Sequence, residues 1–128
     1  IMAFWNAPLD CEDHADLAVK SALEVLDATK KLNEELAPLN LPPINVGIGI
    51  STGECIVGNM GSELRFDYSV IGDAVNLGAR LEGQTRNYAG VDLLLSERTY
   101  QLCPDRAFSE VDRIKVKGKS EQVTIYTC

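Results

Sequence analysis

Residues 66–82 read FDYSVIGDAVNLGARLE, and this stretch sets the architecture that we expect. Its first six residues are rich in β-branched and aromatic side chains, which is typical of a strand. Gly72 and Asp73 then end the strand, and Asp73 is placed to cap the free amides of a helix. We expect this helix to end near Gly83. A strand that leads directly into a helix predicts a sheet with helices packed on it.

Residues 44–58, upstream of this stretch, predict two further strands. In residues 44–50, isoleucine and valine alternate with small residues, which is the period-two pattern of a strand. We expect Thr52 and Gly53 to turn the chain and residues 55–58 to return as the hairpin partner. Glycine on one face of a strand weakens it unless a ligand or a second chain must approach the backbone. The glycine spacing fits neither a P-loop nor a dinucleotide-binding loop, so the hairpin is the favoured explanation.

The two ends of the chain add two helices and four strands. Residues 1–5 are an apolar run that predicts a buried strand, which Pro8 ends. A long helix follows with Asp10 as its N-cap, and Pro38 and the pair at 42–43 stop it. The remaining expected elements are a strand at residues 91–95, a helix at 96–102 capped by Ser96, and strands at 113–117 and 122–126.

The composition fits one globular domain and excludes several functions. Of the 128 residues, 45% are hydrophobic and 24% are charged, which fits one domain better than two. The net charge of −7 argues against a partner such as nucleic acid or an anionic membrane, because these require a basic surface. Neither a run of 18 apolar residues nor a signal-peptide pattern occurs. We therefore expect a cytoplasmic location, for this segment alone or as the cytosolic domain of a larger, membrane-attached protein.

The cysteines and the single histidine indicate no metal site. The four cysteines are far apart and form no CxxC pair, so we expect reduced structural thiols. His14 lies in a polar run at a helix start, where a solvated side chain is expected. A catalytic mechanism must therefore work without histidine as the general base.

Two groups of polar residues could carry chemistry. Asn76 and Arg80 stand four apart in the predicted helix and so project from one face. A guanidinium matches phosphate oxygens, and an asparagine one turn earlier can hold a ribose oxygen, although such a pair in isolation is usually a solvated polar face. The second group is KVKGK at residues 115–119, whose lysines alternate on a predicted strand. These lysines fit a bound polyanion and a protected edge strand equally well.

Four blocks of sequence stand out along the chain: MAFWNAP at residues 2–8, VGIGISTGECIVGNMGS at 46–62, FDYSVIGDAVNLGARLE at 66–82 and IKVKGK at 114–119. Together they resemble the class III adenylate/guanylate cyclase catalytic domain. Their order and spacing along the chain make coincidence improbable. The resemblance implies an α/β (α+β) fold, a ferredoxin-like mixed sheet with packed helices. Residues 1–128 would then be a single nucleotidyl cyclase catalytic domain that lacks its N-terminal third.

The resemblance also implies roles for individual residues. Asn76 would orient the ribose, Arg80 would stabilise the charge developing at the α-phosphate, and Lys117 would bind the terminal phosphates. Ser69 stands where animal adenylate cyclases carry aspartate and many bacterial ones carry threonine. Because its hydroxyl can accept from the adenine amino group but can also donate, adenine is favoured rather than forced. The main-chain carbonyl of Val70 is a second candidate contact to the base.

The implied activity is that of an adenylate cyclase, which converts ATP to 3′,5′-cyclic AMP and pyrophosphate. A homodimer would hold the active sites at its interface, and two divalent ions, Mg²⁺ or Mn²⁺, would assist the attack of the ribose 3′-oxygen. The metal-binding aspartates and the base-reading lysine of the family are expected upstream of Ile1. Residues 1–128 alone would therefore be inactive. Two alternatives stay open: a guanylate cyclase, and a catalytically inactive cyclase-like module for dimerisation or nucleotide sensing.

Overall fold

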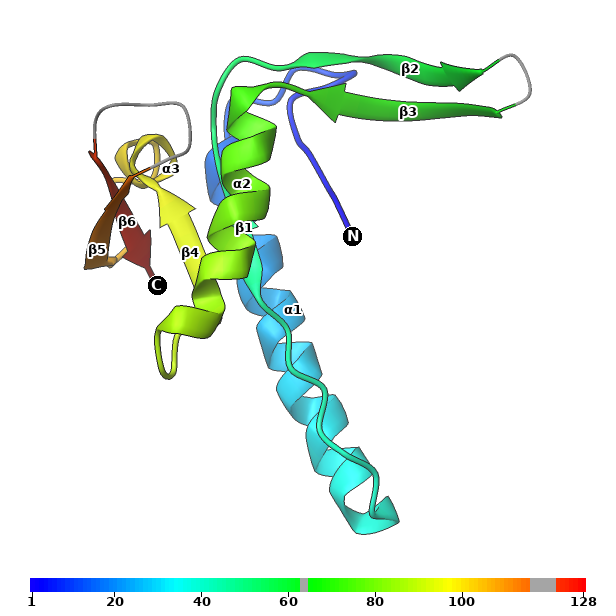
Figure 1. Ribbon diagram of the computed structural model, residues 1–128, viewed down its shortest axis with the longest axis vertical. Helices are drawn as coiled ribbons and strands as arrows, with labels where there is room; N and C mark the ends of the chain where they lie inside the picture. The colour runs from blue at the N-terminus through cyan, green and yellow to red at the C-terminus, as the bar shows by residue number, and fades with distance from the viewer. Residues whose placement is uncertain (63–64, 116–121) are drawn as a thin grey trace.

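The computed structural model describes residues 1–62, 65–115 and 122–128, and Figure 1 shows their arrangement. Helices pack on a mixed sheet, as the sequence predicts. The described elements are α1 (His14–Leu36), the 3₁₀ turn η1 (Ala37–Leu39), β1 (Ile48–Ile50), β2 (Ile56–Ser62), β3 (Arg65–Ile71), α2 (Asp73–Gln84), the 3₁₀ turn η2 (Thr85–Asn87), β4 (Leu93–Ser96), α3 (Glu97–Gln101), β5 (Ser109–Lys115) and β6 (Gln122–Thr127).

The sheet is built around a strand–helix–strand crossover. Its strand order is β1-β4-β6-β5, with β1 parallel to β4 and with β6 antiparallel to both β4 and β5. Parallel neighbours require a crossover connection, and α2 supplies it between β1 and β4. Strands β2 and β3 pair with each other and form an arm that extends away from the sheet, inserted between β1 and α2 (Figure 1).

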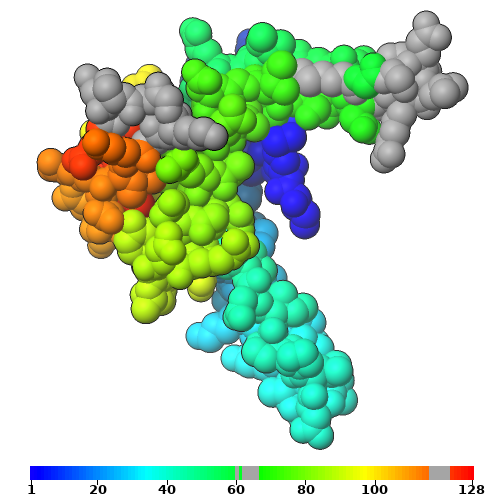
Figure 2. Space-filling model, in the orientation of Figure 1, coloured from blue at the N-terminus to red at the C-terminus, as the bar shows by residue number. Residues whose placement is uncertain are grey.

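The buried strand β4 separates two apolar clusters. Because successive side chains point to opposite faces of a strand, Leu93 and Leu95 pack in the cluster of α1, whereas Leu94 packs in that of α2. Leu81 of α2 and Ile125 of β6 complete the second cluster and are fully buried. The C-terminal end of α1 and the chain that returns toward β1, both cyan in Figure 2, project away from the rest of the molecule.

Gly49 allows α2 to approach the backbone of β1. A Cβ at this position would lie 2.9 Å from Cβ of Leu81, and closer still to the main-chain oxygen of Gly78 and the main-chain nitrogen of Glu82. A close approach is the condition under which glycine is expected within a strand. The approaching group is a helix of the same chain, rather than the ligand or second chain that the sequence suggested.

The predicted hairpin between residues 44–50 and 55–58 is wrong. The pairs in the described sheets join β1 to β4 and β2 to β3. The first strand is also shorter than predicted, since it is limited to Ile48–Ile50. Ile44, the expected first residue of this strand, bonds instead to α1. The side-chain amide of Asn33 accepts from the main-chain nitrogen of Ile44 at 2.7 Å and donates to the main-chain oxygen of Ile44 at 2.9 Å.

Two predictions for the N-terminal segment are also wrong, the strand at residues 1–5 and the start of the long helix. Residues 1–5 form no strand, and the side chains of Ile1 and Met2 are exposed. A buried strand needs a neighbour for its main-chain groups, and none of the strands in the described ranges pairs with this segment. The long helix begins at His14 rather than after Asp10, with Asp13 in the N-cap position and without a side-chain cap. It ends at Leu36, before the prolines, as predicted.

Helix and strand boundaries set by local signals agree better with prediction. The strand predicted at residues 66–71 is β3, and Ser96 caps α3 by accepting from the main-chain nitrogen of Thr99. Asp73, predicted as a cap, is instead the first residue of α2, because Gly72 occupies the N-cap position. Strand β5 ends at Lys115, and residues 116–117 of its predicted range lie outside the described residues.

Candidate functional site

Helix α2 carries the two residues of the predicted phosphate and ribose site. Asn76 and Arg80 are one helical turn apart, so they project from the same face. Asn76 lies in the first turn and is exposed, whereas Arg80 is half-buried. The helix is placed by the close packing of its middle on Gly49 of β1. The site residues are therefore fixed to the core rather than to a loop.

Arg80 is held against the end of β5. Its Nη2 donates to the main-chain oxygen of Lys115 at 3.2 Å. Its Nε is buried and finds no hydrogen-bond partner within the described ranges. A buried donor without an acceptor is unfavourable, so the guanidinium keeps one unused donor beside the last residue of β5. Lys117, the third predicted phosphate-binding residue, lies outside the described residues.

Ser69 and Val70, the predicted base-binding residues, lie on β3 shortly before α2. Ser69 is half-buried and pairs with Gly58 across the arm, while Val70 is 6% exposed and pairs with Val57. A Cβ at Gly58 would meet no described atom within 4 Å. Because paired residues project on the same side of a two-stranded sheet, the missing side chain leaves open space next to Ser69.

The described residues contain no group of three or more His, Cys, Asp or Glu side chains that could hold a metal ion. All four cysteines are free thiols. The prediction that the metal ligands lie upstream of Ile1 stays a prediction. In the described part of the chain, no helix is long and apolar enough to cross a membrane.

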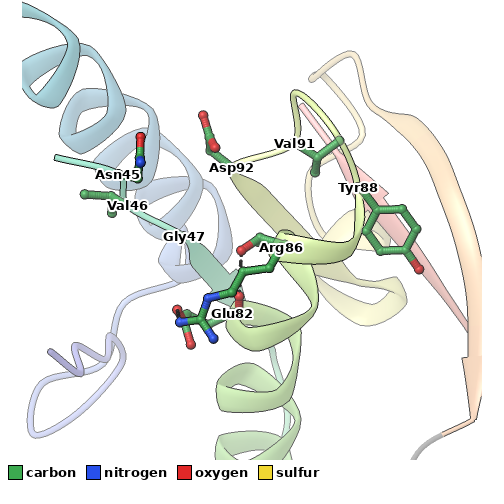
Figure 3. Close-up of a pocket in the computed structure, with 9 residues that line it drawn as sticks. Asn45, Val46, Gly47, Glu82, Arg86, Tyr88, Val91 and Asp92 are labelled. Carbon is green, nitrogen blue, oxygen red and sulfur yellow. Dashed lines mark hydrogen bonds and ion pairs between the residues drawn. The ribbon is translucent and has the colours of Figure 1, made fainter. Parts of the chain in front are cut away.

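A pocket of about 300 Å³ lies at the other end of α2, and Figure 3 shows its lining. Glu82 and Arg86 form an ion pair across 3.6 Å on the α2 side of this pocket, and Asp92 lies on the opposite side. The predicted site residues on α2 and β3 are not part of the lining. The candidate site is therefore a surface of one chain rather than this pocket.

Sequence reasoning missed a second contact between the α2 end and β5. Tyr88, which follows η2, donates its hydroxyl to Oδ2 of Asp112 at 2.7 Å. This hydrogen bond raises the pKa of Tyr88 and lowers the pKa of Asp112. No sequence signal could have linked the two residues, because they are 24 apart and belong to different elements.

The sequence matches the model of the adenylate and guanylate cyclase catalytic domain over residues 1–127. The chain belongs to this family. Adenylate cyclase 1 of Rhizobium meliloti (strain 1021) is 35% identical to this cyclase domain over 127 residues, which are 98% of the chain and 19% of that relative. The adenylate cyclase of Anabaena cylindrica is 37% identical over 131 residues, 98% of the chain and 26% of that relative. The cyclase domain thus spans about a fifth to a quarter of the length of these curated relatives.

Solved structures show the same fold. The adenylyl cyclase CyaB from P. aeruginosa superposes with a TM-score of 0.84 at 34% identity, covering 94% of this cyclase domain and 62% of that chain. The guanylyl cyclase Cya2 superposes with a TM-score of 0.79 at 35% identity, covering 94% and 60%. The predicted class III nucleotidyl cyclase fold is therefore confirmed.

Proposed function

We propose that residues 1–128 form one domain of an adenylate cyclase, which converts ATP to 3′,5′-cyclic AMP and pyrophosphate. One observation carries the proposal: the buried Nε of Arg80 has no hydrogen-bond partner among the described residues, and Arg80 lies on the helix face that also presents Asn76. The similarity to adenylate cyclases of Rhizobium meliloti and Anabaena cylindrica supports ATP as the substrate.

In the proposed reaction, the ribose 3′-oxygen attacks the α-phosphorus, the bond to the bridging oxygen of the β-phosphate breaks, and pyrophosphate leaves. Negative charge grows on the α-phosphate oxygens, and a preorganised guanidinium stabilises it. Arg80 fits this role because the core fixes its helix and its Nε has no hydrogen-bond partner among the described residues. Asn76 would orient the ribose one turn earlier, and Lys117 would bind the terminal phosphates.

Ser69 and the main-chain carbonyl of Val70 are the proposed contacts to the base. The space left by Gly58 supports this role, because a flat ring needs room beside the Ser69 hydroxyl. That hydroxyl can accept a hydrogen bond from the adenine amino group. We expect the full-length protein to use ATP with a clearly higher kcat/KM than GTP.

We further propose that the site is completed in a homodimer. Asn76 is exposed in this chain, and the arm exposes apolar side chains that a second subunit could cover: Ile56 is 69% exposed, Ile71 52% and Tyr68 47%. Large exposed apolar side chains clustered on one element mark interaction surfaces. Two divalent ions, Mg²⁺ or Mn²⁺, belong to the proposal as the family's cofactors. The described residues include no group of three or more side chains that could hold these ions. The roles proposed for Arg80, Asn76 and Ser69 do not require them.

The replacement Arg80→Ala tests the proposal. Loss of a charge stabiliser that acts in the transition state costs about 3 to 4 kcal/mol, so kcat should fall by two to three decades with KM nearly unchanged. Initial rates of the full-length protein with ATP and Mn²⁺ measure both constants. Arg86→Ala is the matched control, because Arg86 lies in η2, directly after α2, and lines the pocket rather than the proposed site. An increase in KM alone, or an equal loss of kcat in the control, would contradict the role.

The same assay decides between the alternatives. The similarity to the guanylyl cyclase Cya2 and the ability of Ser69 to donate a hydrogen bond favour a guanylate cyclase as the second candidate. A higher kcat/KM for GTP than for ATP would establish it. Nucleotide binding without any turnover by the wild-type protein would instead indicate an inactive, nucleotide-sensing module.

A further inference from the structure

We propose that Tyr88 and Asp112 are a positioning pair that holds the end of β5 against α2 for the cyclase reaction. The inference rests on the proposed function and adds two residues to it. Neither Tyr88 nor Asp112 lies in the four sequence blocks that resemble the family. Their role follows from the irregular pairing of β5 and from the contacts between this strand and the end of α2.

Strand β5 contains a bulge that turns Asp112 toward the helix. Glu110 pairs with Tyr126 and Asp112 pairs with Ile125, so Val111 is an extra residue in the ladder. Val111 and Ile114 both pack in the cluster of α2, although side chains three apart in a regular strand point to opposite faces. The bulge resolves this conflict and places Asp112 on the face of Ile114. Bulges of this kind redirect side chains and are frequent beside active sites.

The redirected carboxylate receives the Tyr88 hydroxyl. The distance of 2.7 Å from the hydroxyl to Oδ2 is that of a strong, charge-assisted hydrogen bond. Oδ1 of Asp112 also accepts from the main-chain nitrogen of Arg113, so both carboxylate oxygens are engaged. Figure 3 shows the Tyr88 ring directed away from the pocket residues Glu82 and Arg86 and toward β5. Tyr88 therefore lines one side of the pocket while its hydroxyl makes the contact with β5.

A second bond joins α2 itself to the same strand. Arg80 donates to the main-chain oxygen of Lys115, three residues after Asp112. The donors, Arg80 and Tyr88, are eight residues apart in the sequence, and their acceptors on β5 are three residues apart. Two separated attachments prevent β5 from sliding or tilting against α2 unless one of them breaks. Loss of the Tyr88 bond would leave the Arg80 bond and the packing of Val111 and Ile114 to hold β5 against α2.

This geometry links the pair to the proposed chemistry. Asn76 and Arg80 are on α2, whereas Lys117 follows β5 by two residues in the sequence. The placement of β5 against α2 thus helps to set where the Arg80 guanidinium, which donates to the main-chain oxygen of Lys115, lies beside the proposed α-phosphate. Reaction rates depend steeply on such spacing, since a misplacement of about 1 Å can cost about a hundredfold. The pair acts through β5, so its loss should lower kcat more than it raises KM.

The experiment compares four replacements in the full-length protein. Tyr88→Phe keeps the ring and removes the hydrogen bond, and we expect kcat for ATP to fall by about tenfold while KM changes less than about twofold. Asp112→Ala should give the same loss, and Asp112→Asn, which keeps an acceptor oxygen, should restore most of kcat. Tyr100→Phe is the matched control, because it removes a hydroxyl from a ring that stacks on Tyr126 and should leave kcat unchanged.

The double variant Tyr88→Phe with Asp112→Ala should lose no more activity than either single variant, because both remove one interaction. Fully additive losses would overturn the pair. A lower melting temperature with unchanged kcat would show a merely structural role and also overturn it, and Asp112→Ala supplies the same comparison if Tyr88→Phe does not fold. An inactive wild type refutes the proposed function and the pair's role with it. An active wild type with unaffected variants refutes the pair alone.

Discussion

Replacing Gly49 with alanine would force β1 and α2 apart. The new Cβ would lie 2.9 Å from Cβ of Leu81 and closer to main-chain atoms of Gly78 and Glu82. Ordinary contact begins at 3.4 Å, so the gap must widen by about 0.5 Å at Leu81 and by more at the helix backbone. A long side chain could rotate away from such a clash, but the main chain of a packed helix cannot.

The expected loss of stability is large for one methyl group. Overpacking a core costs about 1 to 3 kcal/mol, and we expect about 3 kcal/mol here because the nearest atoms are main-chain atoms. Since domains have a total stability of about 5 to 15 kcal/mol, the variant should still fold. The displaced helix carries Asn76 and Arg80. We therefore expect kcat to fall by about a hundredfold in the folded variant.

Urea titration measures the stability, and ATP turnover at a temperature where all variants are folded measures kcat. Gly83→Ala is the control, because it makes the same change in α2 at a position where a Cβ would meet no described atom within 4 Å. Alanine is favoured over glycine within a helix, so this control should be more stable by about 0.5 to 1 kcal/mol, with unchanged kcat. The reasoning is refuted if Gly49→Ala is as stable and as active as the wild type.

Two further predictions concern titratable groups. The hydrogen bond from Arg106 lowers the pKa of Asp16, so this carboxylate stabilises the fold above its ordinary pKa of about 3.9, and the stabilisation is lost as the pH falls through the lower folded-state value. Asp16→Asn should flatten the fall of the urea midpoint below about pH 4, and an unchanged slope would contradict this. Burial raises the pKa of the Cys103 thiol, so a thiol reagent should label the exposed Cys55 and Cys128 first and Cys103 only after unfolding. Mass spectrometry of the labelled peptides decides, and simultaneous labelling of Cys103 would be the opposite result.

The sequence predicts elements well where the cause is local. The Ser96 cap of α3 depends on a main-chain nitrogen three residues away, and helix α2 ends within one residue of the predicted Gly83. Spacing within one helix also correctly puts Asn76 and Arg80 on one face. Their roles in ribose and phosphate binding stay predictions, and Lys117 lies outside the described residues.

The sequence predictions fail where a residue pattern indicates a close neighbour but does not identify that neighbour. Alternating glycines at residues 47 and 49 are compatible with a hairpin, a ligand or a packed helix. The choice depends on the long-range parallel pairing of β1 with β4, because this pairing makes α2 cross over and pack on Gly49. The bond between Tyr88 and Asp112 is missed for the same reason. It depends on a bulge, and an alternation pattern read from one strand does not place the extra residue.

The insertion of the arm within a crossover connection has an evolutionary consequence. Strands β2 and β3 interrupt the path from β1 to α2, yet the described apolar clusters are built from residues outside the arm. Apart from the buried Val70, residues 56–71 can therefore change without repacking these two clusters, as in a loop that carries its own secondary structure. Lineages can diversify what the arm recognises while they inherit an unaltered scaffold.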